Sequence, residues 1–331
     1  MVDPLISIII PVYNCQEFLY KCYDSIKNQH LKEFEVIFVN DGSSDKSEDI
    51  IRNFAANDSR LILTSQKNSG QAYARNKGLK LANGHYIVFV DSDDWFYDDK
   101  ALLNMYNAIK TSDSDFVQCS FSFVKNHRES NFCIKSKDDK FGERILLDAL
   151  YVNDIYTSPW AKIYKRDFLI RNELYFPEGL VNEDTAHSIL CAACAKKVSF
   201  LSDIVYCSRE REGSTSRASF KRMFLSMHNV MELTRQKLIQ SHKFSSKIEN
   251  AFYARYERSI LYNLLQSAQR NSKDSFISDY EYCIENTDFI RLKKYSKYLP
   301  MLHRCLCGLA SFPTLFYAVV NSAKIVGYRM H

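Results

Sequence analysis

The sequence lacks the marks of exported, disordered and fibrous proteins. Of its 331 residues, 46% are hydrophobic, which excludes disordered and collagen-like chains. No basic residue precedes Lys21 and the first apolar run, LISIII, is short, so we expect no signal peptide. The ten cysteines follow no regular spacing, so we expect reduced thiols in the cytosol and no disulfide framework.

Acidic residues are absent from the C-terminal end of the chain. Residues 291–331 carry seven Lys and Arg and no Asp or Glu, whereas the preceding 290 residues carry 37 basic and 39 acidic side chains. The net charge of +5 therefore averages a near-neutral body and a basic tail. This separation favours an anionic membrane surface over nucleic acid as the partner of the tail.

The tail also contains an uncharged stretch, residues 305–323, which approaches the length of a membrane span. Gly, Ser, Thr and Asn residues dilute its apolar character, and Pro313 would interrupt a helix. We therefore expect a segment that lies in the membrane plane or re-enters it, flanked by basic residues. A spanning helix and a packed helical subdomain with a solvated basic face are the alternatives.

The first third of the chain alternates between apolar runs and segments with helical periodicity. The predicted strands cover residues 5–10, 35–39, 61–64 and 85–90, and the predicted helices cover residues 16–29, 46–56, 71–82 and 100–110. This alternation predicts a parallel sheet covered by helices. Such sheets bind ligands beyond the carboxyl ends of their strands.

The pattern continues less regularly and then changes. Further predicted elements are a strand at 116–124, an unpatterned segment at 125–140, a helix at 144–150, a loop, short strand and helix start at 158–169, and a short strand pair near 198–209. Beyond residue 217, Gly and Pro nearly vanish and long helices are expected. We therefore divide the chain into an α/β domain, residues 1–216, with halves of about 1–110 and 111–216, and a mainly α-helical region, residues 217–331, whose tail begins near 291.

Polar side chains gather where three predicted strands end. The segments PVYN, NDGSSD and DSDDW occupy residues 11–14, 40–45 and 91–95. Asp91 and Asp93 could share a divalent cation with the phosphates of a nucleotide, because Mg²⁺ and Mn²⁺ take oxygen ligands. Solvated turn carboxylates are the alternative. The same triplet recurs at 113–115, before a strand instead of after one, so we expect it at the opposite edge of the sheet.

Three further positions could bind or react with a ligand. Asp41 follows a strand, and the glycine after it permits a sharp turn that would aim the carboxylate at a base or ribose; a local turn contact is the alternative. Arg75 lies on a helix opened by a Ser-Gly turn, where it could meet phosphate or be an exposed helical Arg. Glu183 and Asp184 precede a helix, so they are candidates for a general base or, with Asn182, for a helix cap.

Taken together and in this order, SIIIPVYN, VNDGSSD, NSGQAYARNKGLKLANGHYIVFVDSDDW and EGLVNED resemble family 2 glycosyltransferases of the GT-A fold, over about residues 5–215. The resemblance implies a Rossmann-like mixed sheet flanked by helices. It also implies nucleoside contacts for Pro11, Tyr13, Asn14 and Asp41; nucleotide or donor-sugar contacts for Arg75, Asp91 and Ser92; a Mn²⁺ or Mg²⁺ ligand in Asp93; a catalytic base in Asp184, with Glu183 beside it; and an acceptor side at Trp160 and Lys162.

That family transfers a sugar from a nucleotide sugar to a hydroxyl group, and most members invert the anomeric configuration. The resemblance implies a UDP-linked donor of a hexosyl or N-acetylhexosaminyl group. Only two Trp residues exist and the QxxRW motif of processive synthases is missing, so one sugar per encounter is implied. With the basic tail, we expect a peripheral enzyme at the cytoplasmic face of the plasma membrane that extends a polyprenyl-diphosphate-linked oligosaccharide for capsule, O-antigen or exopolysaccharide synthesis.

Two other functions stay open at this point. The first is a catalytically silent module that binds nucleotide sugar or glycan at the membrane, although such a module would not need the candidate base Asp184. The second is a transferase whose acceptor is polyprenyl phosphate, which is already anionic and needs no base.

Overall fold

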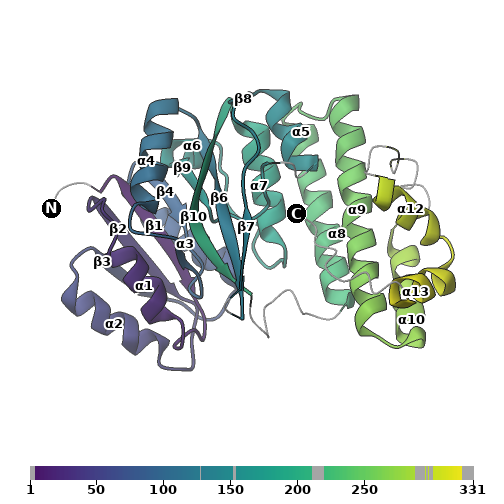
Figure 1. Ribbon diagram of the computed structural model, residues 1–331, viewed down its shortest axis with the longest axis horizontal. Helices are drawn as coiled ribbons and strands as arrows, with labels where there is room; N and C mark the ends of the chain where they lie inside the picture. Colours follow the sequence, from purple (N-terminus) through teal and green to yellow (C-terminus); the bar gives the residue numbers. More distant parts are fainter. Residues whose placement is uncertain are drawn as a thin grey trace. The chain divides into compact units, whose positions relative to one another are not determined.

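The computed structural model describes residues 4–126, 128–151, 154–210, 220–287, 295, 297 and 301–322. The chain divides into two compact units: the N-terminal unit comprises Met1–Ala149 and Asp154–Ser214, and the C-terminal unit comprises Leu150–Asn153 and Thr215–His331. In Figure 1 the N-terminal unit is a sheet between helices, and the described part of the C-terminal unit is helical.

A mixed sheet of ten strands forms the centre of the N-terminal unit, as far as the described residues show. The strands are β1 (Ile6–Val12), β2 (Phe34–Asn40), β3 (Leu61–Ser65), β4 (Tyr86–Phe89), β5 (Trp95–Phe96), β6 (Phe116–Lys125), β7 (Arg128–Phe132), β8 (Lys140–Phe141), β9 (Lys162–Lys165) and β10 (Lys197–Arg209). Their spatial order is β3-β2-β1-β4-β9-β6-β10-β5, with β7 beside β6 and β8 beside β10. Strands β3, β2, β1 and β4 are parallel, whereas β9 is antiparallel to its neighbours β4 and β6. The mixed α/β sheet expected from the sequence is confirmed.

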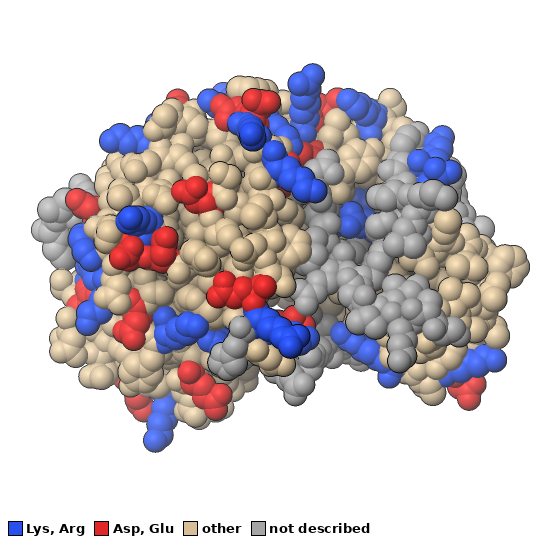
Figure 2. All heavy atoms as spheres, in the orientation of Figure 1, with Lys and Arg blue, Asp and Glu red and all other residues tan. Residues whose placement is uncertain are grey.

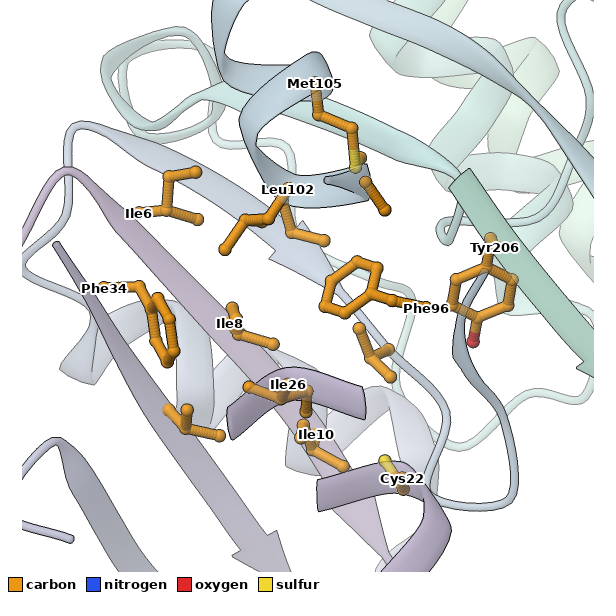
Figure 3. Close-up of a cluster of buried hydrophobic side chains, with 14 of the residues drawn as sticks. Ile6, Ile8, Ile10, Cys22, Ile26, Phe34, Phe96, Leu102, Met105 and Tyr206 are labelled. Carbon is orange, nitrogen blue, oxygen red and sulfur yellow. The ribbon is translucent and has the colours of Figure 1, made fainter. Parts of the chain in front are cut away.

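Helices cover both faces of this sheet. They are α1 (Leu19–Lys27), α2 (Ser47–Asn57), α3 (Gln71–Leu81), α4 (Ala101–Ser112), α5 (Glu143–Tyr151), α6 (Arg166–Arg171) and α7 (Glu183–Cys194). Side chains of β1 alternate between two cores: Ile6, Ile8 and Ile10 pack with α1, α2 and α4, whereas Ile9 packs with α3 and α7. Figure 3 shows the first of these cores, with Phe96 and Tyr206 at one end. Burial on both faces explains the uninterrupted apolar run of β1.

Helix α3 approaches the sheet more closely than a side chain would permit. A Cβ atom at Gly78 would lie 2.4 Å from Cγ2 of Ile9, a fully buried residue of β1. Only glycine therefore fits at this crossing without a shift of the helix. The close packing carries Arg75, about one helical turn earlier, toward the carboxyl ends of β1 and β4.

Two predictions about local structure in the N-terminal unit were wrong. The predicted strand pair near 198–209 is a single strand, β10, which pairs in parallel with β6 from Val198 to Arg209. Register shifts between Leu201 and Tyr206 interrupt the alternation of apolar and polar side chains that a regular strand would show. In the sequence, this interruption looks like a turn between two strands. Strand β7 was missed because it is polar and largely exposed, and it pairs only with β6.

Charged side chains of both signs are interspersed over the N-terminal unit on the face shown in Figure 2. Exposed pairs include Arg171 with Asp167 at 3.2 Å and Lys125 with Glu210 at 2.8 Å. Exposed pairs of this kind contribute about 0–1 kcal/mol to stability. The surface thus agrees with the near-neutral composition of the first 290 residues.

The described part of the C-terminal unit consists of helices α8 (Phe220–Gln240), α9 (Ser246–Arg270), α10 (Lys273–Asn286), α12 (Met301–Leu309) and α13 (Pro313–Ser322). Ser245 and Ser272 cap α9 and α10, because their hydroxyls accept hydrogen bonds from the amides of Ile248 and Ser275. Phe316 of α13 stacks on Phe276 of α10 at 5.9 Å. The long helices expected beyond residue 217 are present.

The uncharged stretch 305–323 is divided between two short helices. Helix α12 ends at Leu309 and α13 begins at Pro313, so Pro313 occupies a first helical position instead of interrupting a longer helix. Asn321 donates to the carbonyl of Ala268 on α9, and Phe316 is buried, so α13 packs within the C-terminal unit. Among the described residues, no helix has the length and apolar character needed to cross a membrane. The packed alternative therefore describes α12 and α13, while Arg291, Lys293, Lys294, Lys324 and Arg329 of the basic tail lie outside the described residues.

Candidate active site

The guanidinium of Arg75 joins two of the predicted site segments. Arg75 Nη2 contacts Asp91 Oδ1, just beyond β4, and Arg75 Nη1 contacts Glu183 Oε1 at the start of α7, both at 2.8 Å. Arg75 and Glu183 are almost completely buried, whereas Asp91 remains partly exposed. Burial acts to lower the pKa of Arg75, but the two carboxylates raise it above its usual value. Arg75 is therefore a buried, charged link between the carboxylates, and not an exposed helical side chain.

Glu183 and Asp184 occupy the first turn of α7, where the positive end of the helix dipole favours carboxylates. Burial raises the pKa of Glu183 to about 7, and the charge of Asp184 acts in the same direction while Arg75 opposes it. Burial also raises the pKa of Asp184, against the opposing charge of Arg75. A raised pKa brings a carboxylate closer to the proton affinity that a general base needs near neutral pH.

Of the three sequence-based candidates for the N-cap of α7, Asn182 is the one that holds the position. Asn182 occupies the N-cap position with a left-handed backbone (φ 65°), but its side chain makes no capping hydrogen bond. Asp184 lies inside the first turn, where its Oδ1 accepts a hydrogen bond from the amide of Thr185 at 2.8 Å. Asp184 is therefore not the cap of the helix.

The turn after β4 is held by strand β10. The Tyr206 hydroxyl accepts a hydrogen bond from the Asp91 amide at 3.0 Å and donates to Asp94 Oδ2 at 2.8 Å. Burial raises the pKa of Asp94, and the charges of Asp93 and Asp91 raise it further. Ser92 is buried and its hydroxyl contacts Cys15 Sγ at 3.0 Å. Three carboxylates, at 91, 93 and 94, therefore lie close enough to repel one another.

These carboxylates fit a hard divalent cation. Their oxygens are the ligand type that Mg²⁺ and Mn²⁺ prefer, and a cation would offset the mutual repulsion that raises the pKa of Asp94. Within the described ranges, no three His, Cys, Asp or Glu side chains form a preassembled metal-binding group. The protein ligands would thus be few, which suits a cation that also binds the phosphates of a nucleotide.

The loops after β1 and β2 are joined through Asn14. Its side-chain oxygen accepts from the Ser44 amide at 2.8 Å, and its own amide donates to Ser43 Oγ at 3.0 Å. Tyr13 is 48% exposed beside it, and Pro11 is buried within β1. Asn14 has a left-handed backbone, φ 49°, which this residue type tolerates better than most. Tyr13 is therefore the accessible ring of this segment.

Asp41 contacts the loop that precedes α3. Its Oδ1 accepts from the Ser69 amide at 2.8 Å and Gln66 Nε2 at 2.9 Å, and its Oδ2 accepts from the Gly70 amide at 2.8 Å. Asp41 is buried, and it organises a loop distant in sequence instead of its own turn. Both carboxylate oxygens already have protein donors in this arrangement.

Trp160 and Lys162 lie on either side of the transition into β9. The Trp160 ring stacks on Tyr206 at 4.9 Å, with planes 8° apart. Lys162 is buried and donates to the carbonyls of Tyr156 and Ser158, so it fixes the loop that carries Trp160. Burial lowers the pKa of Lys162 to about 7. Through these hydrogen bonds, Lys162 stabilises the loop that carries Trp160.

The structure brings Arg75, Asp91 and Glu183 into direct contact, with Asp184 and Asp93 as their chain neighbours. Asp41 and Asn14 stabilise neighbouring loops and make no hydrogen bond to this group among the described contacts.

Sequence reasoning missed Tyr206 and Asp94. Tyr206 stands in an ordinary strand sequence, and its role depends on a contact with a turn more than a hundred residues away, so no local signal marks it.

Comparisons with known proteins identify the family of this chain. Residues 7–172 match the model of glycosyl transferase family 2. The chain is 33% identical over 227 residues to glycosyltransferase GlyA of Streptococcus pneumoniae, which covers 66% of this chain and 32% of GlyA. It is 28% identical to glycosyltransferase GlyG of the same organism, over 84% of this chain and 92% of GlyG. The chain thus spans only about a third of the length of GlyA.

A solved structure shows the same fold. The S. aureus TarS 1–349 complex with UDP-GlcNAc superposes with a TM-score of 0.73 at 23% identity, over 98% of this chain and 93% of that one. The family match covers β1 to α6 and therefore includes the turn after β4 and the helix that carries Arg75. This chain belongs to glycosyl transferase family 2.

Proposed function

We propose that this glycosyltransferase transfers one sugar from a UDP-linked donor to a hydroxyl group of a lipid-linked oligosaccharide, with inversion and with a divalent cation. The observation that carries the proposal is the contact of Arg75 with both Asp91 and Glu183. Asp184, the proposed base, follows Glu183 in the first turn of α7, and Arg75 joins that turn to Asp91 on the proposed donor side. Donor binding and acceptor activation would then occur side by side.

Asp184 is proposed to accept the proton of the acceptor hydroxyl as its oxygen attacks the anomeric carbon. Burial raises the pKa of Asp184, which strengthens it as a base once it is ionised. Arg75 holds Glu183, so the neighbouring carboxylate is kept away from the acceptor by a buried ion pair. Inversion follows when the attack comes from the face opposite the departing diphosphate.

Asp93 is proposed to hold the cation, Mn²⁺ or Mg²⁺, with Asp91 and Ser92 beside the donor. A bound cation would offset the negative charge that develops on the leaving diphosphate. The Arg209 guanidinium donates through Nε to the carbonyl of Asp93 at 3.0 Å, which fixes the backbone of this residue. The chain itself thus supplies a carboxylate on a braced turn.

The donor is proposed to be a UDP-sugar carrying a hexosyl or N-acetylhexosaminyl group. The support is the structural likeness to TarS, which was crystallised with UDP-GlcNAc. Tyr13 offers an exposed ring to the nucleoside, next to the loops that Asn14 and Asp41 hold. Transfer of a single sugar, rather than processive synthesis, is part of the proposal, since the QxxRW motif is missing.

Sugar transfer from a panel of UDP-sugars in Mn²⁺, with Asp184→Asn and Asp167→Asn, tests the base. Asp167 is a matched control because it also lies in the first turn of a helix, α6, but is exposed and paired with Arg171. We expect Asp184→Asn to lower kcat at least about a hundredfold with unchanged UDP binding, and Asp167→Asn to keep normal activity.

Other outcomes of this experiment favour the alternatives. UDP binding by the wild-type protein without transfer or donor hydrolysis, across all donors and acceptors, would support a catalytically silent binding module. Full activity of Asp184→Asn with polyprenyl phosphate as acceptor would support that acceptor, because its attacking oxygen is already ionised.

The enzyme is proposed to act as a peripheral protein at the cytoplasmic face of the plasma membrane, in capsule, O-antigen or exopolysaccharide synthesis. Residues 291–331 are basic and contain no acidic residue. Between α12 and α13, Phe312 is 63% exposed, and Leu315 in α13 is 50% exposed. Basic residues beside exposed apolar ones favour binding to anionic lipid, at about 1 kcal/mol per basic residue near the surface.

Vesicle flotation of the full chain tests this association. We use point variants because truncation near residue 290 would uncover Phe276, which α13 covers. We expect Phe312→Ser with Leu315→Ser to reduce binding to anionic vesicles. The control pair Leu225→Ser with Ile239→Ser, which are apolar and 42% and 44% exposed on α8, should leave it unchanged. Unchanged binding of both pairs would reject this surface as the membrane contact.

A further inference from the structure

Tyr206 lies at the point where strand β10 meets the turn after β4. The side chain is 1% exposed and packs beside Phe96 in the first core (Figure 3). Its hydroxyl has two partners on that turn, the amide of Asp91 and the carboxylate of Asp94. A buried hydroxyl that accepts one hydrogen bond and donates another is fully used and rigidly oriented.

A second residue of β10 holds the same turn. The Arg209 amide donates to Asp94 Oδ1 at 2.7 Å, and Arg209 Nε donates to the carbonyl of Asp93 at 3.0 Å. Within the turn, the Asp94 amide donates to the Asp91 carbonyl at 3.0 Å. Residues 91–94 are therefore held at both ends by one strand, and the Asp93 side chain is carried on a braced backbone.

The Tyr206 ring is held in turn by the acceptor-side segment. Trp160 stacks on it at 4.9 Å, and Phe121 of β6 meets the Trp160 ring edge-on at 4.8 Å. The loop that carries Trp160 is fixed by the buried amine of Lys162. A continuous series of contacts thus leads from Lys162 through Trp160 and Tyr206 to the turn at Asp91.

We propose that Tyr206 is a positioning residue of the transferase, which holds the 91–94 turn in the conformation that presents Asp91 and Asp93 to the donor. Trp160, stacked on Tyr206, links this turn to the acceptor side. The inference rests on the proposed donor site at Asp91 and Asp93. Its physical basis is that a preorganised carboxylate turn binds its ligand without first losing conformational freedom.

The Tyr206→Phe variant isolates the hydroxyl. It keeps the ring that stacks on Trp160, but it leaves the Asp91 amide and the Asp94 carboxylate without that partner. Tyr164→Phe is the matched control, because Tyr164 is also 1% exposed and, among the described residues, its hydroxyl contacts the Pro159 carbonyl at 3.5 Å. Trp160→Phe, on a loop instead of a strand, is a second test should Tyr206→Phe fold poorly.

Two readouts are measured on the full chain: amide hydrogen exchange of the peptide covering residues 88–96, and UDP affinity by calorimetry with and without Mn²⁺. We expect Tyr206→Phe to accelerate exchange in that peptide and to weaken UDP binding in Mn²⁺ by about tenfold, the effect of losing one hydrogen bond in a charged group's network. Trp160→Phe should act in the same direction with a smaller effect, and Tyr164→Phe should change neither readout.

The outcomes separate this inference from the proposed function. Unchanged exchange in Tyr206→Phe, or faster exchange with unchanged UDP affinity, would overturn the positioning role. Asp93→Asn is measured in parallel: if it weakens Mn²⁺-dependent UDP binding while Tyr206→Phe does not, the donor site stands and the inference fails. If UDP affinity in the wild type does not depend on Mn²⁺, the metal assignment fails, and Tyr206 is still judged by exchange and by metal-free UDP affinity.

Discussion

The tripeptide Asp-Ser-Asp occurs twice in the N-terminal unit, at residues 91–93 and 113–115, in two different environments. The first follows β4 and contacts a buried guanidinium, a buried tyrosine and a third carboxylate. The second ends α4 and leads into β6. Both β4 and β6 pair with β9, and their first residues lie opposite its end, so the second triplet lies at the edge of the sheet where β4 begins. The opposite placement predicted from the sequence is confirmed.

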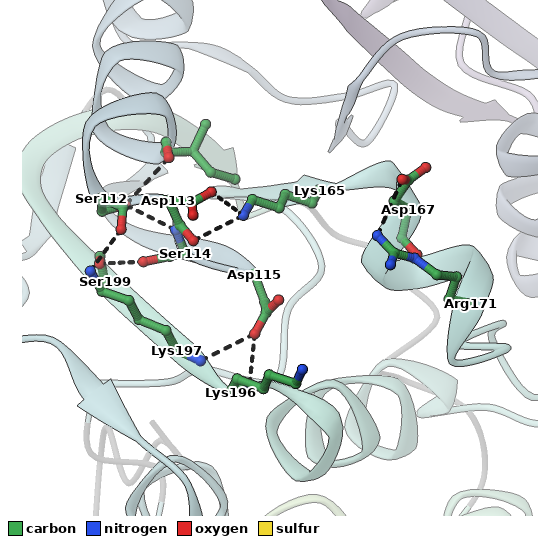
Figure 4. A network of polar contacts seen from close by, with 11 residues as sticks. Ser112, Asp113, Ser114, Asp115, Lys165, Asp167, Arg171, Lys196, Lys197 and Ser199 are labelled. Carbon is green, nitrogen blue, oxygen red and sulfur yellow. Dashed lines mark hydrogen bonds and ion pairs between the residues drawn. The ribbon is translucent and has the colours of Figure 1, made fainter.

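The side chains of the second triplet all have structural partners (Figure 4). Asp113 terminates α4 with a left-handed backbone, φ 53°, and its exposed carboxylate pairs with Lys165. The Ser114 hydroxyl contacts that of Ser199 at 2.5 Å, and Asp115 Oδ2 accepts from the amides of Lys196 and Lys197. A hydrogen bond from Lys165 lowers the pKa of Asp113. This triplet closes a helix and joins two strands.

The difference lies in what surrounds the carboxylates. At 113–115 each carboxylate meets a cation or backbone amides that stabilise its charge. At 91–94, burial and neighbouring acidic groups raise the pKa of Asp94. A single guanidinium, that of Arg75, is shared between Asp91 and Glu183. Acidic groups whose pKa is raised by burial and by one another are a feature of functional sites, where a bound ligand can offset their charge. The same tripeptide therefore lies in two different electrostatic environments.

The largest contrast is expected between Asp93→Asn and Asp115→Asn. The first removes the proposed cation ligand and should lower sugar transfer by about a thousandfold. The second keeps an oxygen that can accept from the Lys196 and Lys197 amides, so activity should not change. The measurement is the initial rate of UDP release at saturating Mn²⁺. Equal rates in the two variants would contradict a functional difference between the two triplets.

A smaller contrast is expected when the cation partner of each triplet is removed. Arg75→Met leaves Glu183 buried without its partner and should destabilise the N-terminal unit by about 3 kcal/mol. Lys165→Met loses only a contact with the exposed Asp113 and should not shift the unfolding midpoint measurably. Urea unfolding followed by Trp fluorescence reports this unit, because both tryptophans, Trp95 and Trp160, lie in it. Similar midpoints would contradict the buried-link interpretation.

The smallest contrast concerns pH. Burial raises the pKa of Glu183 to about 7, so the contribution of Glu183 to stability is present at low pH and is lost as the pH rises toward 7. The pKa of Asp113 is lowered instead, so its contribution is present above the usual pKa of an Asp carboxyl and is lost as the pH falls. For catalysis, kcat/KM should fall at acidic pH as Asp184 is protonated, and this acid limb should lie above the usual range of an Asp carboxyl, because burial raises the pKa of Asp184.

Glu183→Gln removes a negative neighbour of Asp184 and should move this acid limb to lower pH. Asp113→Asn should leave the profile unchanged. The measurement is kcat/KM against pH from 5 to 9 for the three proteins. An acid limb that moves upward in Glu183→Gln would contradict the proposed coupling of the two carboxylates.

The N-terminal unit shows which strands and helices could be predicted from the sequence. Strands buried on both faces, such as β1 and β2, were found within two residues, because a continuous apolar run has few other uses. Helix α1 begins at Leu19 instead of residue 16, since the amides of Cys15 and Gln16 donate to Ser47, the first residue of α2, and to Asp45 just before it. The irregular strand β10 and the exposed β7 were not recovered, because bulges and solvent exposure remove the alternation that identifies strands.

The sequence by itself determined the alternation of strands and helices in the first third of the chain, the polar strand ends and the family, because each depends on short segments. Only the tertiary structure decided which of two identical triplets faces Arg75, and that Tyr206 and Asp94 belong to the same group. Those contacts join residues separated by up to 115 positions in the chain, as between Asp91 and Tyr206. Burial and the position of neighbouring charges set the pKa of a carboxylate, and both arise only when the sheet brings distant segments together.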